Sequence, residues 1–228
     1  MSEAQAREAA APLDREVIVT SLEVVLVVAY LLIYIWIIEP RSRAYAAPGF
    51  VLFFAFAFLL HVRHNDTAAD LGIRLDTFGR ALREAFFVIV PALILTAALG
   101  VRLGGGVALD PRRTALAFLW GYPWALFQQY GLQCVIGRRL AGVVRGEVAH
   151  DVTCAAIFGA LHLPNPFLTV VTFGAGYCFC ALFRRCPNLF ALGAAHALST
   201  SVLYYCLPPA VTHLMRVGPG YLLELRWH

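Results

Sequence analysis

A few polar side chains interrupt the long apolar stretches in the second half of this chain. They are amides, imidazoles and a hydroxyl: Gln128, Gln129, Gln133, His162, His196 and Thr200. Imidazole changes its charge near neutral pH and can serve as a general base or a metal ligand. A carboxamide donates and accepts hydrogen bonds but takes up no proton. Such a set can position a water molecule, and of its members only the histidines can accept a proton from it.

The spacing of these residues predicts a shared site. Gln129 and Gln133 are four residues apart, as are His196 and Thr200, and residues four apart lie on one face of a helix. A polar group in a bilayer tends to face the bundle interior or a hydrated cavity, because an unpartnered one is costly. We therefore expect three helices to direct these side chains into one polar pocket. The spacing equally allows that they only join neighbouring helices by hydrogen bonds.

The composition predicts the elements that hold these residues. Of the 228 residues, 60% are hydrophobic and 14% are charged, and the mean hydropathy is +0.71. Soluble domains are about 45–50% apolar and about 25% charged, and a membrane-spanning helix needs about 20 mainly apolar residues. The sequence thus predicts an all-α, polytopic transmembrane helix bundle of about seven spans.

The apolar runs give the predicted limits of the spans. They are residues 17–38, 48–62, 85–99, 114–136, a short fifth element at 152–163, 167–183 and 189–207. Charged and apolar residues alternate over 66–83, which is typical of a loop leading into an amphipathic turn on the membrane surface.

The charged residues point to an orientation in the membrane. The basic residues are all arginines, scattered over the loops rather than gathered in a patch, which argues against a nucleic-acid partner. Arginines are more numerous on the N-terminal side of the predicted spans, so the N-terminus is expected in the cytoplasm and the protein in the cell (inner) membrane. We expect His61, His64 and His150 in solvated loops, and the cysteines as buried thiols without a zinc-site pattern.

The motifs in the second half resemble those of the CAAX-protease and bacteriocin-processing (CPBP) family. Phe158 to His162 resembles its Phe-x-x-x-His motif, and His196 to Thr200 is similar to its His-x-x-x-Asn motif. Residues 128–133, Gln-Gln-Tyr-Gly-Leu-Gln, fall on its Glu-Glu-x-x-x-Arg motif, and the Leu-Gly-Ile-Arg of residues 71–74 is similar to another short signature. The predicted division is a polar segment at 1–16, two spans in 17–65, a CPBP-like membrane domain at 66–207 and a tail at 208–228.

The resemblance implies an intramembrane endopeptidase of the type II CAAX prenyl protease kind. Its partners would be the lipid bilayer and a peptide or lipid-modified protein substrate, with no nucleic acid. Gln128 falls at the position of the general base, Gln129 at its neighbour and Gln133 at the arginine. His162, His196 and Thr200 fall at positions that bind or polarise the scissile carbonyl.

The amides put the chemistry in doubt. General base catalysis contributes about 10²- to 10⁴-fold in rate, and Gln128 cannot supply it. Because both carboxylates and the arginine are replaced together, no unpaired charge is left in the pocket. Three hypotheses follow: a peptidase that uses His162 or His196 as base or as ligands of a metal, a non-catalytic binding protein that uses the former substrate cleft, and an assembly protein whose polar cluster locks helices. No cofactor is predicted, since two histidines make only half a metal site.

Overall fold

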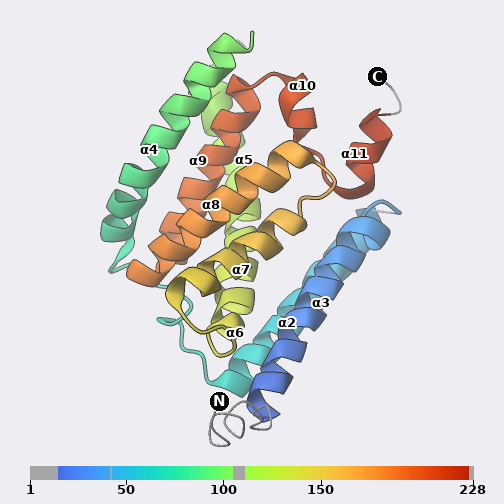
Figure 1. Cartoon of the computed structure of the whole chain (residues 1–228), viewed down its shortest axis with the longest axis vertical. Coiled ribbons are helices and arrows are strands. Elements are labelled where there is room, and N and C mark those ends of the chain that lie inside the picture. The colour runs from blue at the N-terminus through green and yellow to red at the C-terminus, as the bar shows by residue number, and fades with distance from the viewer. Residues whose placement is uncertain (1–14, 42, 105–110, 226–228) are drawn as a thin grey trace, which may run out of the picture.

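The computed structural model describes residues 15–41, 43–104 and 111–225, and within these ranges it is helical without any strand. The predicted all-α class is therefore confirmed (Figure 1). The elements are α2 Arg15–Ile33 with the π-helix η1 Tyr34–Ile38, η2 Arg43–Tyr45, α3 Ala46–His64, α4 Phe78–Arg102, α5 Pro111–Gln129 with the π-helix η3 Tyr130–Gly137 and α6 Arg138–Leu140, α7 Glu147–Ala160, α8 Pro166–Arg185, α9 Leu189–Cys206, α10 Pro209–Thr212, η4 His213–Met215 and α11 Gly218–Leu225.

Five of the described helices are long and apolar enough to cross a membrane. They are Arg15–Ile38, Ala47–His64, Phe78–Arg102, Pro166–Arg185 and Leu189–Cys206. Large apolar side chains cover their outer faces, as on α4, where Phe87 is 70% exposed. Such a surface suits lipid rather than water. The other two predicted spans correspond to the helical stretch 111–140, made up of α5, η3 and α6, and to α7, so a total of seven spans stays a prediction.

Several predicted limits were wrong. α4 begins at Phe78, so the end of the expected surface segment 66–83 belongs to a membrane-length helix. The fourth helix was expected to stop at Gly137, but it continues through this glycine to Leu140. α7 begins at Glu147, five residues before the predicted start at 152. Periodic apolar residues indicated the helices, whereas their ends depend on contacts between distant segments.

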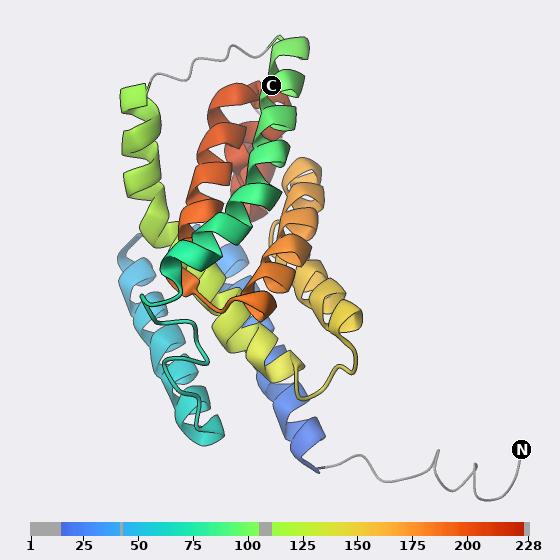
Figure 2. The same cartoon turned by 90° about the vertical axis from the view of Figure 1, so that its left-hand side faces the viewer.

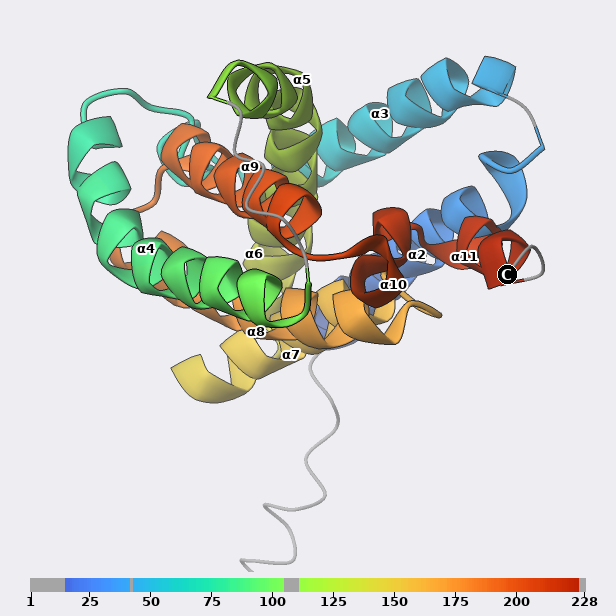
Figure 3. The same cartoon turned by 90° about the horizontal axis from the view of Figure 1, so that it is seen from above.

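Helix α9 is the centre of the bundle. It packs against α5 on one side and α4 on the other, while α7 and α8 form an antiparallel pair (Figures 2 and 3). Glycines allow the close approaches: a side chain at Gly193 of α9 would meet Leu126 of α5, and one at Gly100 of α4 would meet the Cys206 carbonyl. Of the 18 residues of α9, 56% are buried inside the protein. A polar residue in α9 therefore needs a hydrogen-bond partner within the bundle.

Asn188 attaches the loop between α3 and α4 to the start of α9. Its side-chain oxygen accepts a hydrogen bond from the Ala191 backbone N–H at 2.9 Å, and its amide donates to the Arg74 carbonyl at 2.8 Å. The Leu189 N–H donates to the Gly72 carbonyl at 2.9 Å. Gly72 has φ +64°, a conformation that side chains disfavour, which fits its place at this close approach.

Asn165 attaches the C-terminal segment to the start of α8. Its oxygen caps the helix by accepting from the Leu168 N–H at 3.1 Å, and its amide donates to the carbonyls of Thr212 and Arg216 at 3.1 and 3.0 Å. Asn165 is fully buried. The described part of the predicted tail, residues 208–225, is therefore packed against the bundle.

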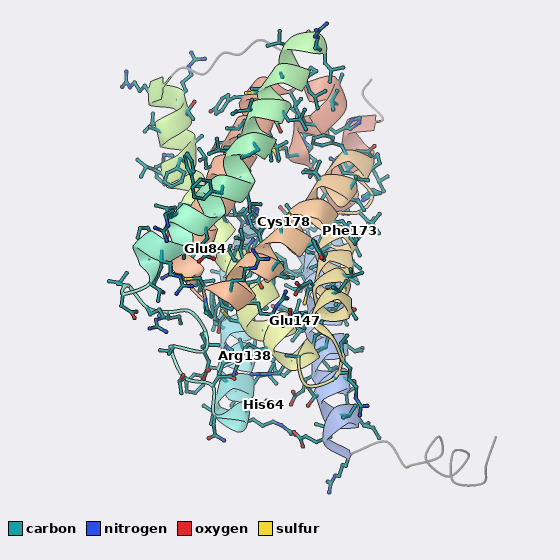
Figure 4. All side chains as sticks on the ribbon, turned by 60° about the vertical axis from the view of Figure 1, so that its left-hand side comes forward. His64, Glu84, Arg138, Glu147, Phe173 and Cys178 are labelled. Atoms are coloured by element: carbon teal, nitrogen blue, oxygen red, sulfur yellow. The ribbon has the colours of Figure 1, made fainter. Side chains whose placement is uncertain are left out.

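A buried ionic network lies at the end of the bundle where α2 begins. Asp66 contacts both Arg138 and Arg139 at 2.7 Å and His61 at 2.8 Å. His61 also contacts the Tyr130 hydroxyl at 2.9 Å. Figure 4 shows Arg138 toward this end of the molecule, as it does His64 and Glu147.

The expectation that three histidines lie in solvated loops was wrong. His61 and His64 belong to α3 and His150 to α7, and His61 is only 8% exposed. His64 contacts Glu23 of α2 at 2.9 Å, and His150 contacts the Gly137 carbonyl at 2.9 Å. Each imidazole thus joins its own helix to another.

Candidate functional site

A cavity of about 270 Å³ opens between the N-terminal helix pair and the second half of the chain. Most of its wall is apolar and aromatic, including Phe50 and Phe53 of α3 and Trp124 and Phe127 of α5. The side chains that add nitrogen or oxygen atoms are Tyr30, Tyr34, Trp124, Gln128, His162, Thr172, His196, Ser199 and Thr200. Among the described residues, no Asp, Glu or Arg lines it. The wall therefore suits a mainly apolar ligand with a neutral polar group.

Four of the predicted site residues line this cavity: Gln128, His162, His196 and Thr200. They come from α5, from the turn after α7 and from α9. The other two, Gln129 and Gln133, do not line the cavity but lie beside it in the core. Gln129 is fully buried, and Gln133 is 4% exposed. The six residues thus form one group, with four at the cavity and two supporting them from behind.

His196 is held by a hydrogen bond and by two aromatic rings. Its Nδ1 lies 3.0 Å from the amide nitrogen of Gln129. The ring of Phe179 lies 5.5 Å away, and that of Phe158 lies edge-on at 5.9 Å, measured between ring centroids. Contacts on several sides fix the ring plane, so the edge opposite Nδ1 is the part available to a ligand in the cavity.

His162 is oriented by its own helix. Its Nδ1 lies 2.7 Å from the Phe158 carbonyl, which can only accept, so Nδ1 carries the proton. The Phe158 ring packs edge-on against this imidazole at 4.8 Å. Gly159 and Gly176 let α7 and α8 lie close together: a side-chain carbon at Gly159 would lie 2.9 Å from the Thr169 carbonyl oxygen, and one at Gly176 would lie 3.2 Å from Phe158. The Phe-x-x-x-His spacing thus places one aromatic ring beside both histidines.

The π-helix η3 follows directly after Gln129 and is buried from Gly131 to Gly137. A π-helix winds more widely than an α-helix, and such turns occur frequently at functional sites. The side chain of Gln133 in η3 still meets Gln129, donating to its oxygen at 3.2 Å. Periodicity predicted that these two glutamines share a face, but it did not predict the change in helix type.

The sequence did not indicate which residues form the rest of the wall. The first helix pair contributes an aromatic side, in which the Tyr30 hydroxyl donates to the Gly49 carbonyl at 2.7 Å. Met215 and Val217 of the C-terminal segment line the cavity as well. The aromatic residues of 30–34 and 50–53 were a usable signal, whereas nothing in the tail sequence distinguishes Met215 from an ordinary apolar residue.

Within the described ranges, no three side chains of the types His, Cys, Asp or Glu gather in a way that could hold a metal ion. His162 and His196 are the two imidazoles of the cavity wall. Two protein ligands fall short of the three or four that zinc sites use. The arrangement instead supplies hydrogen-bond donors and acceptors to a neutral group.

Comparison with known proteins agrees with the motifs. Residues 124–202 match the family described as type II CAAX prenyl endopeptidase Rce1-like, which confirms the predicted resemblance over this region. All six predicted site residues lie inside the matched segment. No curated protein and no solved structure gave a match. The apolar helices and this family likeness together indicate an integral membrane protein.

Proposed function

We propose that this protein binds a membrane-embedded or lipid-modified peptide in the cavity and holds the peptide backbone there. Gln128 does not act as a general base, so the bound peptide is not hydrolysed by that route. The observation that carries the proposal is the cavity itself. Gln128, His162, His196 and Thr200 line it, and no carboxylate of the described residues does. The apolar wall can contact a lipid chain or apolar side chains, and these four polar side chains can form hydrogen bonds with a peptide bond.

The missing base argues for binding rather than cleavage. A water molecule beside Gln128 could be oriented by the amide oxygen, but the amide cannot take its proton. Loss of a general base costs about 10²- to 10⁴-fold in rate. Cavity and polar contacts are independent of that base, so binding survives where hydrolysis does not.

A peptidase that uses His162 is the second candidate, and one contact favours it. Because Nδ1 donates to the Phe158 carbonyl, the neutral ring carries its lone pair on Nε2. Nε2 would take a proton from water as the water oxygen bonds to the scissile carbonyl carbon. The C–N bond would then break as this proton passes to the leaving amine, giving an acid and an amine.

Binding and cleavage can be separated on the full-length protein in lipid nanodiscs. A fluorescent farnesylated peptide reports binding by anisotropy, and mass spectrometry of the same mixture reports cleavage. Wild type is expected to bind and not to cleave. Cleavage that is lost in His162→Ala would establish the second candidate instead, and absence of binding would remove the proposal.

A second pair of variants tests where the peptide lies. Ala175 of α8 lines the cavity, whereas Val170 of the same helix is 71% exposed on the outside. Ala175→Phe fills part of the cavity and is expected to weaken binding at least about tenfold. A tenfold change in Kd corresponds to a loss of about 1.4 kcal/mol in binding free energy. Val170→Phe adds the same ring outside and should leave binding unchanged. Equal affinity in the two variants would place the peptide elsewhere.

Restoring the charged residues tests whether the cavity still aligns a peptide for attack. The triple variant Gln128→Glu, Gln129→Glu, Gln133→Arg supplies a base and places one arginine beside the two carboxylates, so that part of their charge is compensated. We expect it to cleave the bound peptide about 10²-fold or more above wild type. A triple variant that folds and binds but does not cleave would mean that the cavity no longer aligns the scissile bond.

The orientation of the protein is part of the proposal. We infer that the end of the bundle carrying the start of α2 faces the cytoplasm of a cell whose inner membrane holds the protein. Arg63, Arg138, Arg139 and Arg184 belong to ion-paired clusters outside the cavity, and positive loops are retained on the cytoplasmic side. Labelling a single introduced cysteine at position 142, in intact cells, with a reagent that cannot cross the membrane tests it: no labelling is expected before lysis.

A further inference from the structure

A chain of hydrogen bonds runs through the core behind the cavity, from Gln133 through Gln129 to His196. The Gln133 amide nitrogen donates to the Gln129 amide oxygen at 3.2 Å. The Gln129 amide nitrogen in turn lies 3.0 Å from Nδ1 of His196. An amide nitrogen only donates and an amide oxygen only accepts. Because the Gln129 oxygen receives the bond from Gln133, the Gln129 nitrogen is the atom that faces His196.

The direction of this chain determines which nitrogen of His196 carries the proton. Nδ1 receives an N–H from Gln129, so it must present its lone pair, and the proton of the neutral ring lies on Nε2. Gln129 is fully buried and Gln133 is 4% exposed, so water has little access to replace either bond. In such surroundings an unmade hydrogen bond is costly, which gives one tautomer a clear preference.

We propose that Gln129 is a positioning residue that locks His196 in the Nε2–H tautomer, with Gln133 fixing the orientation of the Gln129 amide. His196 thereby presents an N–H donor at the ring edge opposite Gln129. A carboxylate at position 129 would have the reverse effect. It only accepts, so it would draw the proton to Nδ1 and leave a lone pair on Nε2.

His162 has the opposite polarity. Its Nδ1 donates to the Phe158 carbonyl at 2.7 Å, so its Nε2 accepts. The two imidazoles of the cavity therefore offer one donor and one acceptor. This pair complements a secondary amide, which carries one carbonyl and one N–H. The match to an amide rests on the proposed function, whereas the tautomer of His196 does not.

The tautomer can be measured directly by NMR on ¹⁵N-histidine-labelled, full-length protein in lipid without any ligand. Protonated and unprotonated ring nitrogens differ widely in ¹⁵N shift. The His196 signals are assigned by their loss in His196→Asn, and those of His162 by their loss in His162→Asn. At neutral pH we expect His196 protonated on Nε2 and His162 on Nδ1, each by at least about tenfold over the other tautomer.

The Gln129→Glu variant tests the cause. We expect the His196 proton to move to Nδ1, or both nitrogens to be protonated, while His162 keeps its tautomer. Gln129→Leu should only weaken the preference, because it removes the donor without adding an acceptor. A wild-type His196 protonated on Nδ1, or an Nε2–H tautomer that persists in Gln129→Glu, would overturn the proposal. The first of these outcomes needs only the two assignment variants to fold, not Gln129→Glu.

The peptide-binding measurement distinguishes this inference from the proposed function. If His196 has the wrong tautomer but the farnesylated peptide still binds, the hydrogen-bond chain is refuted and the function stands. If the tautomer is as proposed but no peptide binds, the chain stands and the cavity serves another ligand.

Discussion

Asp66 is the carboxylate at the centre of the buried ionic network, in contact with His61, Arg138 and Arg139. Burial alone would raise its pKa, but hydrogen bonds from Arg139, His61 and Arg138, with the charge of Arg139, outweigh burial and lower the pKa far below that of an ordinary aspartate. Arg139 is itself only 3% exposed. Loss of the Asp66 carboxylate would therefore leave the charge of Arg139 in the interior without its acidic partner.

Asp66→Asn is expected to lower the free energy of unfolding by about 3–5 kcal/mol, since it leaves a buried arginine unpaired. Asp70→Asn is the matched control: its carboxylate lies on the surface, 3.9 Å from Arg138, and its loss should cost less than about 1 kcal/mol. Thermal unfolding in detergent compares the two. Equal stabilities would mean that Asp66 does not hold the network together.

The pH dependence follows from the direction of the Asp66 pKa shift. A lowered folded-state pKa adds stability that is fully present above the unfolded pKa of about 3.9 and is lost as the pH falls through the folded value. The difference between wild type and Asp66→Asn should thus stay constant from about pH 7 to 5 and shrink below about pH 4. A difference that instead grows on acidification would contradict this assignment.

How far the site could be predicted differs from residue to residue. Gln128, His162, His196 and Thr200 could be grouped from sequence because polar residues in apolar helices need a common polar surrounding. His61 could not, since its burial depends on Asp66 and Tyr130, which reach it only in the folded chain. The catalytic roles that the resemblance implies for the group stay predictions.

α4 and α9 are held at a distance that only glycine permits. Gly100 is the clearest case: a side-chain carbon there would lie 2.1 Å from the Cys206 carbonyl oxygen, which is far inside contact distance. Because the colliding atom belongs to the backbone of α9, it cannot turn away. This contact at the C-terminal end of α9 therefore helps to determine the position of the whole helix, including His196.

Gly100→Ala should push α4 from α9 and lower the free energy of unfolding by about 1–3 kcal/mol, as overpacking does. Gly121→Ala in α5 is the control, because no described atom lies within 4 Å of its added carbon. That change should be neutral or stabilise the helix by up to about 1 kcal/mol. Similar unfolding temperatures for both variants would show that the interface between α4 and α9 can accommodate an added methyl group.

The elements were predicted well where one run of apolar residues makes one helix. α8 and α9 lie close to their predicted limits, because Asn165 with Pro166, and Asn188, mark the starts of these helices locally. The segment Tyr130–Gly137 was predicted as part of a helix but not as a π-helix. The segment is buried, so its helix type depends on the packing around it rather than on local sequence signals. Local signals thus fix the starts of α8 and α9, whereas the starts of α4 and α7 were not predicted.

At the scale of the molecule, both ends of the described chain help to enclose the cavity. Tyr30 and Tyr34 line it from the first helix, and Met215 and Val217 line it from the C-terminal segment. Gly218 lies where the C-terminal segment meets the first helix: a side-chain carbon at this position would lie 2.9 Å from Ile35. Its N–H donates to the Leu163 carbonyl, in the turn after α7, at 3.0 Å. The region matched by the family model therefore supplies only part of the enclosure.

Gly218→Ala tests this closure. Gly218 has φ +54°, and an added carbon would lie 2.9 Å from Ile35, so we expect a loss of about 1–2 kcal/mol in unfolding free energy. Gly220→Ala, two residues further along α11, has no described atom within 4 Å and should cost nothing. If the tail closes the cavity, Gly218→Ala also weakens binding of the farnesylated peptide. An unchanged affinity would mean that the tail is only attached nearby.

Trp124 stands in this wall with its indole half exposed, 51%, and stacked on Phe127 at 5.4 Å. Of the tryptophans that the structure describes, Trp36 and Trp120 do not line the cavity. Indole emission shifts with the polarity of its surroundings. With the other tryptophans replaced by phenylalanine, Trp124 becomes an optical reporter in the cavity wall, and quenchers attached to acyl chains at known depths would locate that wall within the bilayer.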